Sequence, residues 1–449
     1  MKKMLCLLLG LLSQANFAQE HYAGINTSQR GGIINAGVNP AELVNLNARY
    51  DIHVISISAK ASNSELGFSD LVGGGDFADK LFTGNTAVDL RMDAQITGPG
   101  IAWNSQRWAF AFTTKGHAKL DLVDVDANLG DALTNSAIDS YLSGSSVIAN
   151  SNNQRLAGTS WGEVAFSAAT ILFEDATHKL NLGASVKLLF PGSYANFGAN
   201  EFSGTVHNEF GEVSLTNAQA NLNIAYSGNL GDDFSQFGDY ASSLFGKPNG
   251  VAADIGVNYR LKDAEEGHYK LNVGVAVKNI GSMKFKSNDN SDTNYVLSVQ
   301  GTDTLGLNQF QGAQSLREIE SLLLASGFLN KTVAERKSFK VTLPTVLTAY
   351  ADLKIVPQFY VTAFAQLKMR KDEENTQIAG QNVFSLTPRF TTRTIEVYLP
   401  MSSSEFSGFA TGLGFRAYGF FIGSGSVITA LLSDAKQADA YIGYGFQFD

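Results

Sequence analysis

Apolar and polar residues alternate along much of this chain, most plainly from Gly250 to Phe285. Residues 271–278 put apolar side chains at the odd positions and small or polar side chains at the even ones. A period of two predicts a β-strand with two unlike faces, and the polar residues 262–268 predict a tight turn. The stretch is therefore a hairpin whose strands reach about ten residues or more, enough to cross a bilayer when tilted.

Other stretches repeat this pattern. Residues 88–97 alternate cleanly, with Asp89, Arg91 and Asp93 on the polar face. Trp108, Phe110 and Phe112 share one face of the next strand. In a membrane barrel the aromatic faces meet lipid and the polar faces meet a wet lumen. The alternative is a soluble sandwich, in which a second sheet would have to cover each apolar face.

The spacing of the strands also favours a transmembrane barrel, because short turns alternate with long loops. The short turns fall at 104–107, 174–178, 262–268 and 355–357, and the long loops at 61–87, 121–158, 229–247 and 286–336. The pattern gives fifteen strand segments, with 179–190, 193–207 and 213–227 counted separately and 382–399 counted once. A single-chain barrel has an even number. We therefore expect about fourteen strands, with the error near 416–437.

A short helix is expected in the longest loop. Ser315 and Glu318 form a capping box ahead of an amphipathic run, and Gly327 is placed to end the helix. The predicted fold is thus all-β: an antiparallel transmembrane β-barrel with short helices in its external loops.

Composition agrees with this interpretation and excludes others. The 449 residues are 44% hydrophobic and only 17% charged, and they include 44 Gly and 30 Phe. No apolar run of about 18 residues follows the N-terminus, which argues against transmembrane helices. The net charge of −9, with no Lys/Arg cluster, argues against a nucleic-acid partner.

The N-terminus predicts export. Lys2 and Lys3 precede an apolar run that ends in small residues, so residues 1–18 are expected to be a signal peptide. The single cysteine, Cys6, lies inside that run and too early for a lipoprotein. The mature chain would have no cysteine, which excludes disulfides and thiolate metal sites.

Residues 19–48 precede the barrel, which we expect to span 49–449. This Gly- and Asn-rich segment lacks steady alternation and contains the turn Asn39-Pro40-Ala41. We interpret it as a plug or periplasmic segment, because side chains alone do not fill a fourteen-stranded barrel. The alternative is a disordered tail.

Three charged residues are candidates for a role in the lumen, namely Asp89, Arg91 and Asp93. They could pair with polar groups of the plug such as Arg30 and Asn35, or form a structural ion-pair ladder, and the ladder is the more ordinary arrangement.

The sequence gives little reason to expect an enzyme. Residues 158–162 match G-x-S-x-G, but a strand follows where a nucleophile elbow needs a helix. Residues 124–128 resemble the start of a calcium loop, yet Leu129 stands where Gly is required. The six histidines show no i, i+4 pair. We expect no catalytic residues, no metal site and no cofactor.

Several short motifs together resemble the FadL-like superfamily of outer-membrane barrels. They are Asn39-Pro40-Ala41, the Asp254-x-Gly256-x-x-Tyr259 pattern, residues 277–281 with Asn279 and Gly281, Leu343-Pro344-Thr345, and Gly412-x-Gly414-x-Arg416. The likeness is greatest to uncharacterised barrels related to the barrel subunit of type IX secretion. The chain also closes on an aromatic strand, residues 441–448, as such barrels do, although Asp449 follows the last aromatic residue.

The resemblance implies a Gram-negative outer-membrane protein, embedded in lipid, with an N-terminal plug inside a closed barrel. Its implied function is a channel for uptake of hydrophobic or amphipathic small molecules. The alternative is a barrel that transports nothing and acts as a partner in protein secretion or envelope assembly.

Overall fold

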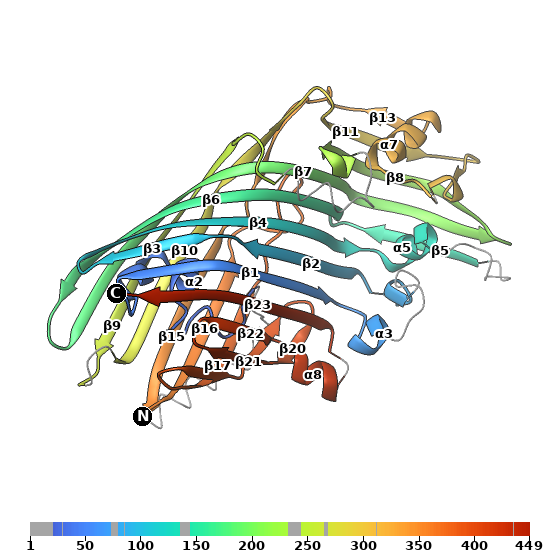
Figure 1. Cartoon of the computed structure of the whole chain (residues 1–449). Coiled ribbons are helices and arrows are strands. Elements are labelled where there is room, and N and C mark those ends of the chain that lie inside the picture. The colour runs from blue at the N-terminus through green and yellow to red at the C-terminus, as the bar shows by residue number, and fades with distance from the viewer. Residues whose placement is uncertain are drawn as a thin grey trace.

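In the computed structural model the strands close into a ring, and each runs antiparallel to its neighbours (Figure 1). The structure describes residues 21–28, 30–72, 80–84, 86–134, 144–231, 244–264, 268–310, 312–433 and 435–449. The predicted signal peptide, residues 1–18, lies outside the described residues. The ring has 14 strands, which confirms the predicted antiparallel barrel.

The ring follows the chain order, and β23 closes it by pairing with β1 from Tyr50↔Phe448 to Ser62↔Gln437. Some ring positions are shared by two short strands. In order, the ring consists of β1 (Tyr50–Asn63), β2 (Val88–Thr97) with β3 (Gly100–Ser105), β4 (Trp108–Val125), β6 (Gln154–Glu174), β7 (His178–Glu209), β9 (Gly250–Lys262), β10 (Tyr269–Lys286), β14 (Ser338–Thr342) with β15 (Val346–Val356), β16 (Phe359–Lys368), β17 (Val383–Thr391), β18 (Ile395–Tyr398) with β19 (Met401–Ser404), β20 (Gly408–Thr411) with β21 (Leu413–Ala417), β22 (Phe420–Ser424) and β23 (Gln437–Phe448).

The sequence prediction divided some strands wrongly. Residues 179–190 and 193–207 form one strand, β7, because the pairing with β6 skips Gly192 beside Pro191. This bulge accommodates a residue that has no N–H to donate. Residues 213–227 form β8, which lies outside the ring, and residues 382–399 form two ring strands, β17 and β18. The error was therefore not near 416–437.

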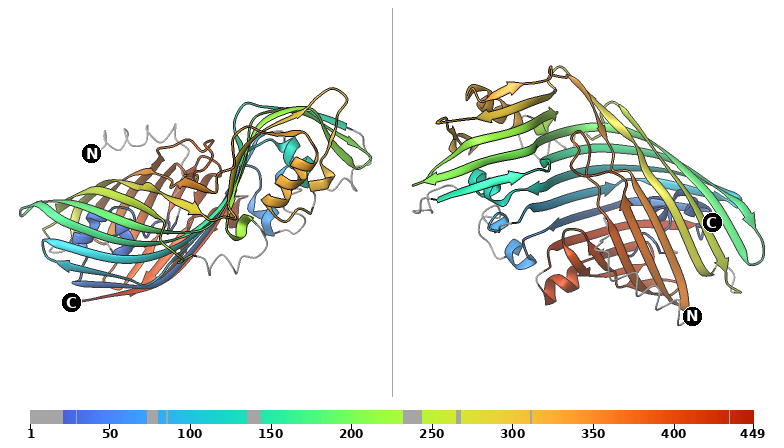
Figure 2. Two further views of the ribbon diagram at one scale, coloured as in Figure 1. Left: turned by 90° about the horizontal axis from the view of Figure 1, so that it is seen from above. Right: turned by 180° about the vertical axis from the view of Figure 1, so that it is seen from behind.

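Beyond the ring the sheet continues as an extension, seen to the right of the ring in the view from above (Figure 2). The outer half of β7 pairs with β8 on one edge and with β5 on the other. The expected loops at 121–158 and 286–336 thus contain strands. The extension comprises β5 (Gly144–Asn150), β8 (Glu212–Ser227), β11 (Ser291–Val299), β12 (Leu305–Gly306) and β13 (Leu329–Lys331).

Short helices lie in the same region and in the long connections. The Ser315 cap is confirmed, because its side chain accepts a hydrogen bond from the Glu318 amide at 3.1 Å, and Gly327 follows the helix with a φ of 80°. The Glu318 side chain accepts from the Gln314 amide at 3.0 Å, one residue before the position that a full capping box would use. These helices are α3 (Phe68–Val72), α5 (Ala127–Thr134), η3 (Asn229–Gly231), η4 (Asn308–Phe310), α7 (Leu316–Ala325) and α8 (Val427–Leu432). No helix among the described residues is long and apolar enough to cross a membrane.

The ring is apolar outside and polar inside. On β1, Ile57 is 46% exposed, whereas its neighbours Ser56 and Ser58, which face inward, are 1% and 2% exposed. The same contrast runs around the ring. Exposed apolar side chains on its strands include Met92, Ile96, Phe166, Val186, Val257, Leu353, Phe390, Phe415, Ile422 and Ile442. An apolar surface on every ring strand far exceeds the patches of a soluble monomer and fits a lipid-facing band.

Candidate functional site

The inside of the ring is occupied by the described part of the N-terminal segment 21–49, namely residues 21–28 and 30–49, which include α2 (Ile33–Ala36) and η2 (Pro40–Asn45) and lie within the ring in Figure 2. Their contacts reach opposite parts of the wall. Tyr22 shares a hydrogen bond of 2.9 Å with Ser56 on β1, and Asn39 donates one to the Val257 carbonyl on β9. Ser28 donates to Glu396 on β18. The segment is thus surrounded by the barrel.

The Asn39-Pro40-Ala41 turn starts η2 and rests against two glycines of the wall. Pro40 occupies the first position, where no N–H is needed, and the Asn39 side chain accepts from the Ala41 amide at 3.0 Å. A Cβ on Gly183 would collide with the Pro40–Ala41 backbone, and a Cβ on Gly256 would collide with the Asn39 side chain. The turn motif and Gly256 therefore form one packing unit.

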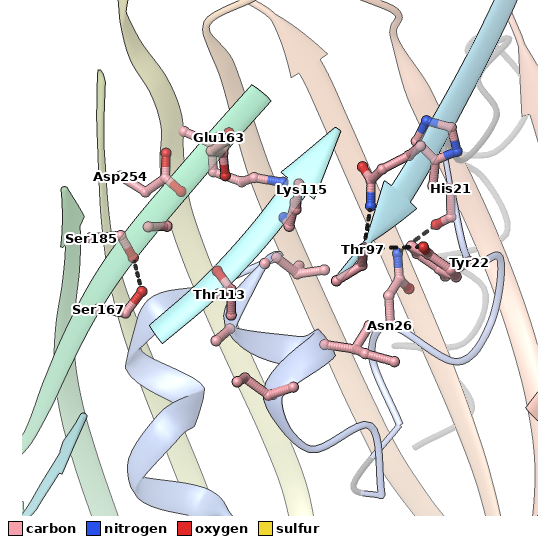
Figure 3. A pocket seen from close by; sticks show the side chains of 18 of the residues that line it. His21, Tyr22, Asn26, Thr97, Thr113, Lys115, Glu163, Ser167, Ser185 and Asp254 are labelled. Atoms are coloured by element: carbon pink, nitrogen blue, oxygen red, sulfur yellow. Dashed lines mark hydrogen bonds between the residues drawn. The ribbon is translucent and has the colours of Figure 1, made fainter. Parts of the chain in front are cut away.

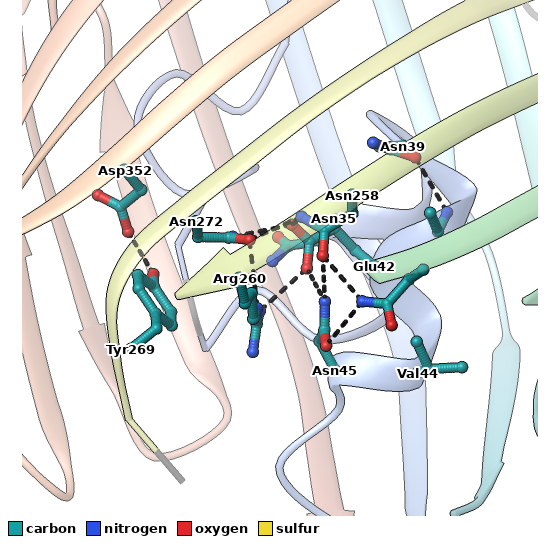
Figure 4. Close-up of polar contacts among 12 residues, drawn as sticks. Asn35, Asn39, Glu42, Val44, Asn45, Asn258, Arg260, Tyr269, Asn272 and Asp352 are labelled. Atoms are coloured by element: carbon teal, nitrogen blue, oxygen red, sulfur yellow. Dashed lines mark hydrogen bonds and ion pairs between the residues drawn. The ribbon is translucent and has the colours of Figure 1, made fainter. Parts of the chain in front are cut away.

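Glu42 is the centre of a buried polar network (Figure 4). Its carboxylate accepts from Arg260 and Asn258 at 2.9 Å each and from Asn272 at 2.8 Å. Tyr350 also donates to it. Burial alone would raise the Glu42 pKa, but the Arg260 charge and these hydrogen bonds outweigh burial and lower it. Glu42 is therefore held as a carboxylate, tied to β9, β10 and β15.

A second contact between family motifs, on β9 and β10, involves Asp254, Asn279 and Gly281. The pairing of β9 and β10 is interrupted at Asn279, which has a φ of 59° and whose amide donates to Asp254 at 2.7 Å. Lys187 makes an ion pair of 2.8 Å with Asp254 and donates to the Asn279 side chain at 2.7 Å. Gly281 is needed because a Cβ there would strike the β9 backbone. This contact shapes the wall.

The structure does not bring Asp89, Arg91 and Asp93 together as one site. Asp93 forms ion pairs with Lys119 at 2.5 Å and with His21 of the N-terminal segment at 3.1 Å. Asp89 accepts from the Asp124 amide at 3.2 Å, near the end of β4.

Arg91 binds a different part of the chain, making an ion pair of 2.7 Å with Asp372. The expected partners Arg30 and Asn35 are not the ones found. The Arg30 carbonyl accepts from Arg416, and Asn35 donates to the Ser28 carbonyl at 2.5 Å. Both residues were expected to face β2. Instead, Asn35 bonds within the N-terminal segment, and the Arg30 carbonyl joins the segment to β21.

Residues 370–381, which connect β16 to β17, also fold into the ring, and the sequence analysis missed them. Arg91 donates to the Gly380 carbonyl, and Arg155 donates to the carbonyls of Asp372 and of Gln377, the latter at 3.0 Å. No periodicity marks this polar stretch. The available signal was indirect, in that two inward-facing arginines needed acceptors.

Between the N-terminal segment and the wall the lumen retains a cavity of about 120 Å³. His21, Tyr22 and Asn26 lie on one side of it, and Lys115, Glu163 and Asp254 lie on the other (Figure 3). A smaller cavity of about 20 Å³ lies next to Arg91, Asp93 and residues 379–381. Each of the two inserted segments therefore leaves a small space against the wall.

A larger hollow lies on the outside of the ring. Its volume is about 830 Å³. Its floor is a row of alanines paired across four strands, Ala440, Ala59, Ala94 and Ala118. Leu230 and Leu316 of the extension also line it. Small side chains on the wall create this space, and we call it the outer groove.

The possible catalytic and metal motifs have structural roles. Ser160 lies within the continuous strand β6, and its side chain accepts from the Ser193 amide at 3.1 Å. Asp126 caps α5 by accepting from the amides of Asn128 and Leu129. Among the residues that the structure describes, no group of His, Cys, Asp and Glu could hold a metal ion.

Comparison with known proteins places most of the chain in one family. Residues 40–425 match the "Family of unknown function (DUF5723)". The chain belongs to this family. The matched range includes the Asn39-Pro40-Ala41 turn from Pro40 onward and the motifs from Asp254 to Arg416. No curated protein matches the sequence of this chain.

Solved structures similar to this DUF5723 protein include two toluene transporters and an autotransporter domain. TbuX of Ralstonia pickettii has 13% identity, with 96% of this chain and 99% of that chain covered and a TM-score of 0.43. TodX of Pseudomonas putida has 10% identity, 91% and 92% coverage and a TM-score of 0.41. The translocator domain of NalP from Neisseria meningitidis has 8% identity, 95% and 99% coverage and a TM-score of 0.34.

Proposed function

We propose that this protein is an integral outer-membrane barrel that acts as a closed, gated channel for uptake of hydrophobic or amphipathic small molecules. The observation that carries the proposal is the apolar exterior of the ring, which continues into the outer groove. Export by residues 1–18 and an outer-membrane location belong to the same proposal.

The outer groove supplies what an apolar solute needs. Ala59 and Ala94 form its floor beside exposed apolar residues such as Ile57 and Met92. A space of about 830 Å³ falls in the range of small-molecule sites, which are mostly apolar. A solute held there would leave water without crossing the polar lumen first.

The interior of the barrel supports a channel that is shut in the state described. Residues 21–49 and 370–381 fill the ring from within, and both are bonded to the wall. An open barrel of this size would leak, so a closed resting state is the physically reasonable one. We propose that the N-terminal segment is the plug and that residues 370–381 form the gate.

The test begins with location. The mature protein should sediment with outer membranes and migrate faster on a gel before heating than after. Recovery in the soluble periplasmic fraction would refute the membrane assignment.

Uptake is then measured in intact cells with N-phenyl-1-naphthylamine, an apolar dye that fluoresces in membranes. Cells with the protein should take up the dye faster than cells without it. Ala59→Phe together with Ala94→Phe should abolish the gain by filling the outer groove. The matched control is Ile57→Phe, on the same outward face but outside the groove. Dye entry that is unaffected by the barrel would exclude hydrophobic uptake.

A second candidate function is favoured by the extension. Its edge strand β5 pairs only with β7 among the described residues, and Val147 on β5 is 73% exposed. An open strand edge is a common place for another chain to add a strand. The protein would then serve as a partner in secretion or envelope assembly. Co-purification with envelope proteins, with no bound lipid found by mass spectrometry, would support this alternative.

A further inference from the structure

Four exposed lysines gather on the outside of the ring, where β10 ends and the chain enters the extension. Lys284 of β10 lies directly opposite Lys340 of β14 in the register of the two strands, and Lys286 lies further along β10. Lys247 comes shortly before Asn249, whose carbonyl accepts a hydrogen bond from the Lys284 amide at 2.8 Å. We call these four residues the lysine patch.

The lysines of β10 face outward because the strand pairing shifts at Asn279. Before this shift the outward residues of β10 have odd numbers, and Val275 among them is 47% exposed. Beyond it the outward residues have even numbers, beginning with Ile280, which is 48% exposed. Lys284 continues this second set, whereas its neighbour Phe285 faces the other way into a buried apolar cluster. The pairing of the wall therefore fixes the direction of the lysine side chains.

The lysine patch begins where the apolar band of the wall ends. The outward apolar positions of β10 run from residue 271 to residue 280, about ten residues, which is the length with which a tilted strand crosses a bilayer. Ser282 then pairs with Thr342, and Lys284 with Lys340 comes next on the same face. This end of the ring carries the long connections, which in membrane barrels face the cell exterior. The patch therefore lies at the depth of the headgroups of the outer leaflet.

The positive charges of the patch have no counter-charge in the part of the protein that the structure describes. Arg336, close to Lys340 in the sequence, pairs with Asp292 at 2.5 Å. In contrast, no ion pair within 4.0 Å joins any lysine of the patch to a described carboxylate. Like charges directly opposite each other on two antiparallel strands destabilise the sheet, as Lys284 and Lys340 do here. An anion bound between the two ammonium groups would remove this repulsion.

Apolar side chains beside the patch favour a lipid over a soluble acidic partner. Phe245 is 51% exposed and packs against Phe190, with 5.7 Å between the ring centroids. Val251, which pairs with Ser282 just below the lysines, is 57% exposed. Aromatic and lysine side chains at the edge of an apolar band are typical of a membrane interface. A lipid presents acyl chains to the band and a phosphate to the lysines at once, which a soluble acidic protein does not.

We propose that the lysine patch binds the phosphate groups of an anionic lipid headgroup in the outer leaflet. Lysine binds phosphate as a compact point charge with three donors. Each lysine near an anionic membrane surface strengthens binding about fivefold. The inference rests on the proposed membrane location and concerns no transported solute. Binding at the patch would set how far the extension stands above the membrane.

The test uses the full-length mature protein, freed of lipid in a non-ionic detergent and analysed by native mass spectrometry with added lipid A that carries two phosphates. The comparison lipid is phosphatidylcholine, which has no net charge, and the intact protein should prefer lipid A. Lys284→Gln should weaken binding of lipid A about fivefold, and Lys284→Gln with Lys340→Gln at least about tenfold. Without lipid the double variant should resist heat at least as well as the intact protein, because the facing charges are gone.

Lys270→Gln is the matched control, since Lys270 is an exposed lysine at the opposite end of the same strand, near Asp263. It should bind lipid A like the intact protein. Equal binding by the double variant, or equal binding of phosphatidylcholine, overturns the proposal. Binding of soluble heparin as tightly as lipid A also overturns it, because the patch would then recognise charge alone and suit an acidic protein. Since binding is measured on the purified folded barrel, failure here is distinct from failure of the location or dye-uptake tests.

Discussion

The two segments inside the barrel are held by different kinds of contact. Residues 21–49 form short helical turns that press against wall glycines and bury the Glu42–Arg260 ion pair. Residues 370–381 have no helix or strand of their own. Arginine side chains reach from the wall to their carbonyls, and an isolated β-bridge joins Gln377 to Thr342 of β14. Helical turns packed on wall glycines favour a fixed plug, whereas an irregular loop joined to the wall by one isolated bridge and by long side chains favours a part that moves.

Deletion of the N-terminal segment is the variant expected to separate the two segments most clearly. We expect that removing residues 21–38 leaves a folded barrel with a large rise in ion conductance in planar bilayers, because the contacts of Tyr22 and Ser28 with the wall are lost. Replacing residues 372–380 with a Gly/Ser linker of equal length should raise conductance less, since the plug remains. A deletion variant that conducts like the intact protein would show that the N-terminal segment does not seal the lumen.

Glu42→Ala should have the largest effect of any single substitution on the plug. It leaves the Arg260 guanidinium without its carboxylate partner, and breaking a buried pair from one side costs about 3–5 kcal/mol. Urea unfolding in detergent measures the loss. The control is Glu335→Ala, which removes an exposed ion pair with Lys337 and should cost at most about 1 kcal/mol. Equal midpoints for the two variants would contradict the role assigned to Glu42.

The sequence predicted the barrel well because its main signal is local. Alternation at 88–97 and 271–278 predicts which face meets lipid. The structure exposes Met92, Ile96 and Val275 on that face, although Val88 and Leu90 at the start of β2 are buried in a hydrophobic cluster. The predicted number of strands was right although some single strands were wrong. Residues 179–207 form one strand where two were predicted, and residues 382–399 form two where one was predicted, so these errors partly offset each other. In the sequence alone, the bulge beside Pro191 resembles the end of a strand.

The site was harder to predict, because it depends on contacts between distant residues. Asn39, Gly256 and Asn279 were named from family motifs, but only the fold shows that Gly256 makes room for the Asn39 side chain. Asp89, Arg91 and Asp93 share a strand face and yet have three unrelated partners. Pairings more than 200 residues apart, such as Glu42 with Arg260, leave no periodic trace.

The gate is tested by Arg155→Met. Arg155 donates to two carbonyls of residues 370–381, and hydrogen bonds from a charged donor contribute about 1.5–3 kcal/mol each. We expect frequent brief openings in single-channel records and faster cleavage of the loop by protease. Arg155→Lys should be intermediate, because lysine keeps the charge but not the fork of donors. Unchanged records for Arg155→Met would mean that the loop is held by other contacts.

The substitution Gly256→Val tests how closely the plug packs against the wall. Its side chain would collide with Asn39 and should cost about 1–3 kcal/mol through displacement of the turn. Gly306→Val is the control, because no atom lies within 4 Å of the position of its Cβ. Cleavage of the N-terminal segment by protease should increase only in the first variant. Equal cleavage in the two variants would show that Gly256 does not form a packing unit with the Asn39-Pro40-Ala41 turn.

The smallest expected effect is a response of the gate to acid, through Asp372. Burial would raise the pKa of this carboxyl, but the charges of Arg91 and Lys368 outweigh burial and hold the pKa below its ordinary value of 3.8. A group whose pKa is lowered by folding stabilises the folded state fully above its unfolded pKa and loses that contribution as the pH falls through the folded pKa. The gate should therefore keep the same conductance from about pH 7 to pH 4 and open more often only in stronger acid. Asp372→Asn should open already at neutral pH and show no further acid step at the gate. A step in the intact protein near neutral pH would point to a titrating group other than Asp372.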